Sequence, residues 1–105
     1  MKKYCVLPFI SVRIEDNKNQ NSMGIRPCCL YRGNDLPVFK SVDEYLKSDF
    51  LAELQQHLLS QDELPSGCET CRYVEAKKLQ SVRQLKNKFF HNIILQETNV
   101  KELDI

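Results

Sequence analysis

The sequence predicts an α+β fold, with a small N-terminal β-hairpin followed by two to four helices. Three observations lead to this prediction. Residues 4–14 mix β-branched and apolar side chains in an alternating pattern that is typical of a strand. Residues 25–31 resume extended character after a polar, Asn-rich segment over 16–23. Residues 41–59 then repeat apolar side chains at helical spacing, so strands come first and helices follow.

The hairpin has three parts in the sequence. Its first strand contains Pro8, which suits an edge strand or a bulge because proline has no backbone N–H to donate. The loop over 16–23 ends at Gly24, and Pro27 comes just before the cysteine pair of the second strand. Two paired strands of this kind would bring Cys5 towards Cys28 or Cys29.

Helical signals fill the rest of the chain. Ser41 and Glu44 form a capping box that predicts a short helix to residue 46, and Ser48 offers a cap for an amphipathic helix over 50–60. Gly67 gives the backbone conformational freedom before a further helix over 68–73. Residues 81–92 are amphipathic, and the β-branched pair within 93–95 favours a short strand.

Length and charge narrow the class of protein. A chain of 105 residues suits one domain, 1–105. The 15 basic and 14 acidic residues give a net charge of +1, so we expect no nucleic-acid partner and no anionic membrane surface. Pro8, Arg13 and Glu15 interrupt the apolar residues near the start, so the pattern holds no signal-peptide core or membrane span. We therefore expect a cytoplasmic protein.

The five cysteines carry the clearest chemical signal. Cys5 stands alone, Cys28 and Cys29 are adjacent, and Cys68 and Cys71 form a Cys-x-x-Cys pair. In a reducing compartment this usage favours metal binding over disulfides, and an odd count agrees. Four thiolates suit either a tetrahedral zinc or a cubane iron–sulfur cluster, and the number of ligands does not separate the two.

Other chemical patterns are weaker. A thioredoxin-like role for Cys68 and Cys71 needs a βαβ context, which the pattern lacks. We find no phosphate-binding loop and no nucleophile elbow, and we assign no catalytic residue. His57 and His91 fit packed or solvated positions better than ligand positions. The basic side chains of 81–92 fit a solvated helix face better than an anion site; these are Arg83, Lys86 and Lys88.

Two segments resemble the SPASM/twitch domains that accompany radical S-adenosylmethionine (SAM) enzymes. The first is a Cys-x-x-Pro-aromatic strand, a glycine turn and a Pro-Cys-Cys strand: Cys5 to Phe9, Gly24, and Pro27 to Cys29. The second is similar to the twitch run Cys-x-x-Cys-x-x-x-Glu, then Ser-x-Arg-x-x-x-Asn: Cys68, Cys71, Glu75, Ser81, Arg83 and Asn87. The helices of 41–59 match the spacer between the segments, so the resemblance covers nearly the whole chain.

The resemblance implies an auxiliary [4Fe–4S] cluster, with Cys5, Cys28, Cys68 and Cys71 as its ligands and cofactor-binding residues. Cys29 is the alternate to Cys28, because neighbouring residues in a strand point to opposite faces and only one should reach the metal. The implied role is electron relay or substrate anchoring. The implied partners are a radical SAM barrel domain or protein and its peptide or small-molecule substrate.

The chain also departs from the family. Relatives have glycine where this chain has Lys78, and it has no Cys-x-x-x-Cys-x-x-Cys run, so it cannot bind the cluster that cleaves SAM. We therefore do not expect it to be an enzyme on its own. It is expected to be the N-terminal part of a longer or split radical SAM protein, or a free-standing accessory protein. Two alternatives stay open, a structural zinc-binding module for protein interaction and a free-standing ferredoxin-like electron carrier.

One further hypothesis concerns Glu75 and Arg83, which lie eight residues apart. In an unbroken helix they would be about 12 Å apart along the axis. They can touch only if the chain turns between them, near Lys78. We expect such a pair to clamp the Cys-x-x-Cys segment to the helix that follows.

Overall fold

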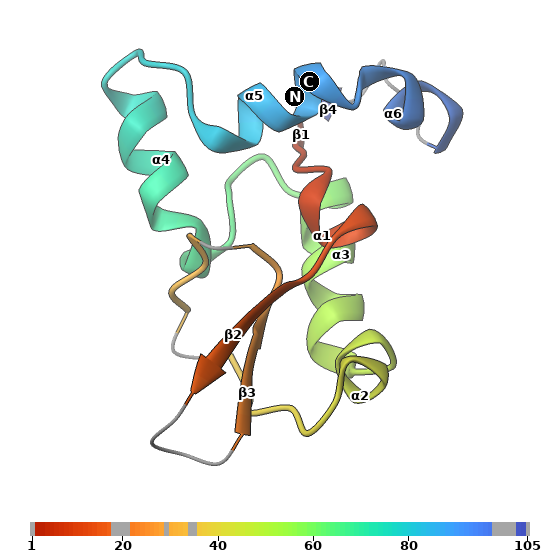
Figure 1. The fold of residues 1–105 in the computed structure, drawn as a ribbon. Helices are drawn as coiled ribbons and strands as arrows, with labels where there is room; N and C mark the ends of the chain where they lie inside the picture. Colours follow the sequence, from red (N-terminus) through yellow and green to blue (C-terminus); the bar gives the residue numbers. More distant parts are fainter. Residues whose placement is uncertain (1, 18–21, 29, 34–35, 98–102, 105) are drawn as a thin grey trace.

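The computed structural model describes residues 2–17, 22–28, 30–33, 36–97 and 103–104. The predicted α+β class is confirmed, with an antiparallel hairpin and several helices packed beside it (Figure 1). In these residues five α-helices follow the hairpin, one more than the predicted upper limit of four. The elements in order are β1 (Lys2–Lys3), α1 (Leu7–Ile10), β2 (Arg13–Asn17), β3 (Ser22–Arg26), α2 (Val42–Leu46), α3 (Asp49–Ser60), the 3-10 helix η1 (Ser66–Cys68), α4 (Glu69–Ala76), α5 (Val82–Phe89), α6 (His91–Glu97) and β4 (Leu103–Asp104).

The hairpin pairs β2 with β3 in antiparallel register, from Arg13 opposite Arg26 to Asn17 opposite Ser22. The ladder therefore extends into the loop predicted over 16–23, of which residues 18–21 lie outside the described part of the chain. A second, parallel pair joins β1 to β4, so the two ends of the described chain meet.

The strand predicted over 4–14 is wrong in its middle, where α1 replaces it. Pro8 lies in the first turn of this helix, a position where its missing N–H costs nothing and its fixed φ suits the helix. The backbone N–H of Ser11 donates to the carbonyl of Leu7 at 2.9 Å. Cys5 consequently lies before α1 rather than on a strand.

The second predicted strand, over 25–31, is shifted as well. The ladder ends at Arg26 because Pro27 has no N–H to continue it. Cys28 therefore lies beyond β3. The expectation that paired strands bring Cys5 towards Cys28 is wrong, because neither residue lies on the hairpin ladder.

The two central helices form as predicted. The Ser41 hydroxyl accepts a hydrogen bond from the Glu44 N–H at 3.1 Å and caps α2. The Ser48 hydroxyl accepts one from the Leu51 N–H at 3.2 Å and caps α3. The buried face of α3 carries Leu51, Leu54 and Leu58, as its leucine spacing indicates.

The short strand predicted over 93–95 is wrong, since these residues belong to α6. The N–H groups of Ile93 and Ile94 both donate to the Phe90 carbonyl, which carries the chain from α5 into α6. Ile94 is fully buried against Tyr4 and Val6. The β-branched pair suggested a strand, but packing of Ile94 on the N-terminal segment favours the helix.

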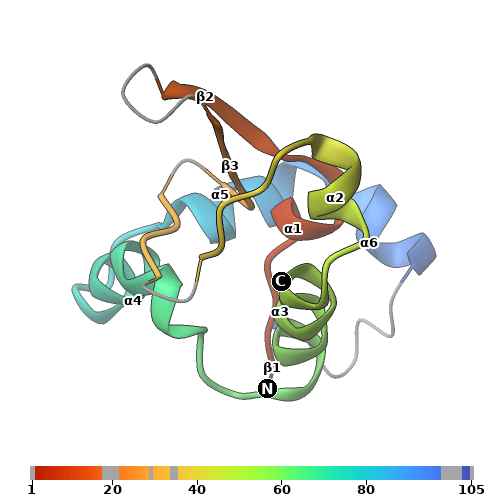
Figure 2. The same cartoon turned by 90° about the horizontal axis from the view of Figure 1, so that it is seen from below.

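The largest core cluster lies where the elements converge, and it includes sulfur. Its buried members are Cys5, Tyr31, Leu54, Leu58, Leu64 and Cys71. Figure 2 shows α4 at one edge of the molecule and α3 nearer its centre, with the segment after β3 between them. The Arg32 N–H donates to the Gly67 carbonyl at 2.9 Å, which ties that segment to η1.

Gly67 has a different role from the one expected. Its φ is not in the left-handed region, so conformational freedom does not require a glycine there. Instead the buried ring of Tyr31 packs directly on it, and a Cβ at position 67 would overlap that ring. Glycine is needed for the close approach of an aromatic ring.

Candidate metal centre

Four cysteines line one small cavity, which we call the cysteine cavity. The other lining side chains are apolar, apart from one arginine. The full lining is Cys5, Leu7, Cys28, Leu30, Leu64, Cys68, Cys71, Val82 and Arg83. Three separate segments supply the thiols: the stretch before α1, the stretch after β3, and the η1–α4 junction.

The Cys-x-x-Cys pair is held by the junction between η1 and α4. Cys68 ends η1 and Cys71 lies in the first turn of α4, so a spacing of three residues places both on one face of the helix. The Arg72 guanidinium donates to the carbonyls of Leu64 at 2.7 Å and Pro65 at 3.0 Å. These bonds fix the chain that leads into the pair.

Cys28 is positioned by a turn. The Tyr31 N–H donates to the Cys28 carbonyl at 3.2 Å. The next residue, Arg32, bonds Gly67 as described above, so the turn is held against η1. Cys29 lies outside the described residues, and its side chain is not placed.

Cys5 is held by bonds to the residues on either side of it. The Tyr4 carbonyl accepts from Arg83 Nη1 and from Asn87 Nδ2, each at 2.8 Å. The Val6 N–H donates to Asn87 Oδ1 at 2.9 Å. Both side chains come from α5, about 80 positions further along the sequence, and both are buried.

Arg83 is the centre of a wider set of bonds, which we call the Arg83 network and which includes Glu75, Ser81 and Asn87. Arg83 Nε and Nη2 donate to the two carboxylate oxygens of Glu75, at 2.8 and 2.6 Å. The Ser81 hydroxyl donates to Glu75 Oε2 at 2.7 Å and caps α5. This geometry joins α4 to α5 and to the N-terminal segment.

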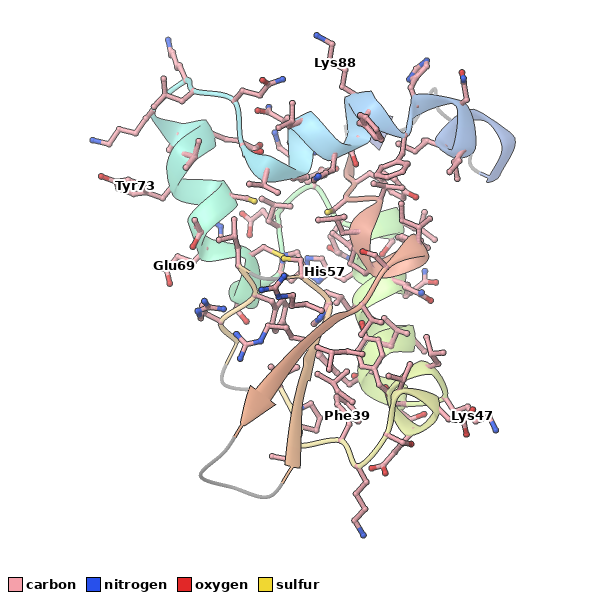
Figure 3. The ribbon with its side chains drawn as sticks, in the orientation of Figure 1. Phe39, Lys47, His57, Glu69, Tyr73 and Lys88 are labelled. Carbon is pink, nitrogen blue, oxygen red and sulfur yellow. The ribbon has the colours of Figure 1, made fainter. Side chains whose placement is uncertain are left out.

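The network confirms the expected contact between Glu75 and Arg83. It also confirms the expected turn, because Lys78 has a left-handed φ of 61° between the two helices. The prediction that Arg83 belongs to a solvated basic face is wrong, since its side chain is only 1% exposed. Lys86 and Lys88 are exposed, and Figure 3 shows Lys88 pointing away from the body of the protein.

Burial keeps the thiols of Cys5 and Cys68 protonated, because each has a raised pKa. Burial raises the pKa of Cys5 to about 12, opposed by a backbone hydrogen bond from Leu7 and by the charge of Arg83. Burial, together with the negative charges that Cys5, Cys28 and Cys71 carry when ionised, raises the pKa of Cys68 to about 12.

The carboxyl of Glu75 is ionised more readily than usual, unlike the buried thiols of Cys5 and Cys68. Its partial burial opposes ionisation, but hydrogen bonds from Arg83 and Ser81 and the charges of Arg83 and Lys3 outweigh that effect. The pKa of this carboxyl is therefore below its ordinary value. The carboxylate form is the one that the Arg83 network holds.

The cysteine cavity is small. The centre of a water molecule can reach about 20 Å³ of it, so the void between atom surfaces is about 3 Å in radius. That space has room for a water molecule or a small inorganic group and is too small for an organic ligand of ordinary size. In the described residues, however, no three His, Cys, Asp or Glu side chains are grouped as ligands of a metal ion. No disulfide joins the four described cysteines either.

The remaining candidate residues lie elsewhere. The His57 ring nitrogen Nε2 lies 2.8 Å from the Glu63 carbonyl, and His91 is exposed; neither lines the cysteine cavity. Sequence reasoning did not assign a role to Asn87 or to Tyr31. Asn87 stood in the twitch-like run, which was the one available signal for it. Nothing local marks Tyr31, because its partner Gly67 is far away in the sequence.

Comparison with known proteins gives no relative from which a function could be carried over. No protein-family model matches the chain, and neither a curated protein nor a solved structure matches it. Across the part of the chain that the structure describes, none of the helices has the length and apolar character needed to cross a membrane.

Proposed function

We propose that this chain is an auxiliary [4Fe–4S] cluster-binding domain of a radical SAM system, with Cys5, Cys28, Cys68 and Cys71 as the four ligands. The observation that carries the proposal is the lining of the cysteine cavity by these four thiols. One thiolate for each iron is the ligation that a cubane cluster requires. Cytoplasmic location and the absence of activity from the chain alone are parts of the same proposal.

The surroundings of the thiols fit such a group. Leu7, Leu30, Leu64 and Val82 form apolar walls, and an apolar surrounding tunes the potential of an iron–sulfur centre. The void is compact, and four thiols of its lining are available as ligands. When bound, the cluster would carry single electrons or offer an iron to a substrate group.

Deprotonating the buried thiols costs free energy when a thiolate-bound metal is taken up. Cys5 and Cys68 have pKa values of about 12 without metal, so binding releases their protons. Arg83, at the wall of the cavity, partly compensates the negative charge that results.

The role beside a radical SAM barrel rests on the twitch-like run. Glu75, Ser81, Arg83 and Asn87 belong to that run, and they bond to one another or to the backbone beside Cys5. Their joint role supports the view that the run is one structural unit built around the cysteines. The barrel of the partner would carry out the radical reaction, which this chain lacks, on a peptide or small-molecule substrate.

The experiment is purification of the chain without oxygen, followed by reconstitution with iron and sulfide. We expect a brown protein with about four irons and four sulfides, and an electron paramagnetic resonance signal of a reduced [4Fe–4S]⁺ cluster after dithionite. Stoichiometric zinc in a colourless protein would overturn the proposal in favour of a structural zinc module. Electron transfer to generic acceptors, with no effect of a radical SAM partner, would favour a ferredoxin-like carrier.

The adjacent cysteines supply a matched control. Cys28→Ser is expected to lose the cluster, whereas Cys29→Ser is expected to keep it, because Cys28 lines the cavity. Loss of the cluster in Cys29→Ser and its retention in Cys28→Ser would make Cys29 the ligand in place of Cys28. Retention of a full [4Fe–4S] cluster by Cys5→Ser or Cys71→Ser would contradict the ligand set.

A further inference from the structure

Arg83 combines two properties that the ligand set alone does not require. It is the only charged side chain among the described residues that line the cysteine cavity, and it is 1% exposed. Its partner Glu75 does not line that cavity. The buried ion pair is therefore oriented with its positive end towards the thiols.

The same residue fixes the backbone at Cys5. Arg83 and Asn87 together make three hydrogen bonds to Tyr4 and Val6, the neighbours of Cys5. Cys5 lies between β1 and α1, so no helix or strand holds it in place. Side chains of α5 consequently take over the positioning that secondary structure provides for Cys71.

We propose that Arg83 is a positioning residue for Cys5 and also a fixed buried charge that raises the reduction potential of the centre held by the four cysteines. The inference rests on the proposed function and adds to it the control of that site. Asn87 shares the first role and, being neutral, lacks the second.

The expected sign follows from electrostatics. Four thiolates around a [4Fe–4S]²⁺ core carry a net charge of −2, and reduction by one electron makes it −3. A cation near the cluster in an apolar wall stabilises the reduced form more than the oxidised form, so it raises the potential. Glu75, behind Arg83, weakens this effect.

The test measures midpoint potentials of reconstituted variants by redox titration. Arg83→Met is expected to lower the potential, and Glu75→Gln is expected to raise it. Arg83→Lys keeps the charge and should stay near the wild-type value. Asn87→Leu breaks the bonds beside Cys5 without changing charge, so it should leave the potential in place while speeding iron loss several-fold. A purely structural Arg83 would make Arg83→Met resemble Asn87→Leu, and equal potentials in all variants would overturn the charge role.

Positioning is tested separately on the metal-free protein by mass spectrometry of iodoacetamide labelling. Arg83→Met and Asn87→Leu should each label Cys5 at least tenfold faster than wild type, with Cys68 labelled at an unchanged rate. Unchanged labelling of Cys5 would refute the positioning role whether or not a cluster binds. If wild type binds no cluster, the proposed function and the charge role fail, and the labelling still decides positioning. If Arg83→Met does not fold, Arg83→Lys with Glu75→Gln decides the charge role.

Discussion

Replacing Arg83 by methionine is expected to destabilise the metal-free fold by about 3 kcal/mol. Methionine keeps an unbranched, flexible side chain in place of the arginine's aliphatic part, but it removes three donated hydrogen bonds, two to Glu75 and one to the Tyr4 carbonyl. Removing one partner of a buried ion pair costs about 3–5 kcal/mol, because the other charge stays buried.

The expected loss of folding free energy for Arg83→Met lies at the lower end of that range. The Glu75 side chain is 12% exposed and keeps the Ser81 hydroxyl, and Lys3 lies 3.8 Å away. The Tyr4 carbonyl keeps its bond from Asn87. A fold of this size has a total stability of about 5–15 kcal/mol, so the variant should fold but unfold at a lower urea concentration, by about 2 M for an m-value near 1.5 kcal/mol/M.

A double-mutant cycle by urea denaturation isolates the pair. Glu75→Gln should also destabilise strongly, because it leaves the buried Arg83 charge without the opposite charge of the carboxylate. The double variant should lose less than the sum of the single losses, by about 2 kcal/mol. Additivity within about 0.5 kcal/mol would refute the reasoning. The exposed pair of Asp43 and Lys47, with side chains 72% and 77% exposed, is the matched control and should show almost no coupling.

Four other outcomes follow from the structure. Gly67→Ala should cost about 1–3 kcal/mol, because its methyl group meets the Tyr31 ring; an unchanged melting temperature would contradict this. Lys78→Gly should be neutral or stabilising by up to about 1 kcal/mol, because it relieves a left-handed φ, and a clear loss would show that the lysine side chain matters. The lowered pKa of Glu75 means that its stabilisation is present above the ordinary glutamate value and is lost as pH falls through the lowered one. Urea midpoints of wild type should therefore fall in acid more than those of Glu75→Gln. The raised pKa of Cys68 means that metal-free wild type should lose stability between about pH 9 and 12, and Cys68→Ala should lose less over that interval.

The helical half of the fold can be predicted from the sequence because capping residues and apolar spacing are local features. Ser41 and Ser48 cap their helices through neighbours three residues away, and the leucines of α3 repeat within one element. The hairpin region is harder to predict. A short apolar run with a proline suits an edge strand and the first turn of a helix equally well. At Pro8 the helix forms, and no residue near it in the sequence reveals that choice.

The cysteine spacing predicted that thiols would gather, but it could not predict what holds them. Gly67 looks like a flexible hinge until Tyr31 is placed on it, and these residues are 36 positions apart. Asn87 bonds backbone groups more than 80 positions away. Contacts of this separation depend on the whole chain path, which periodicity and capping do not specify.

The Arg83 network also explains why Cys5 can lie outside regular structure. A strand or helix at Cys5 would use the Tyr4 carbonyl and the Val6 N–H in its own hydrogen bonds. Because these groups lie in an irregular stretch between β1 and α1, they are available to Arg83 and Asn87. Because the predicted strand is absent here, side chains of α5 can bond the backbone on both sides of Cys5.

The turn at Lys78 brings Arg83 back to Glu75 after α4. Arg83 therefore holds both the backbone beside Cys5 and the helix that carries Cys71. Hydrogen bonds fix the three segments that supply the thiols relative to one another, which would lower the ordering cost of binding the proposed cluster.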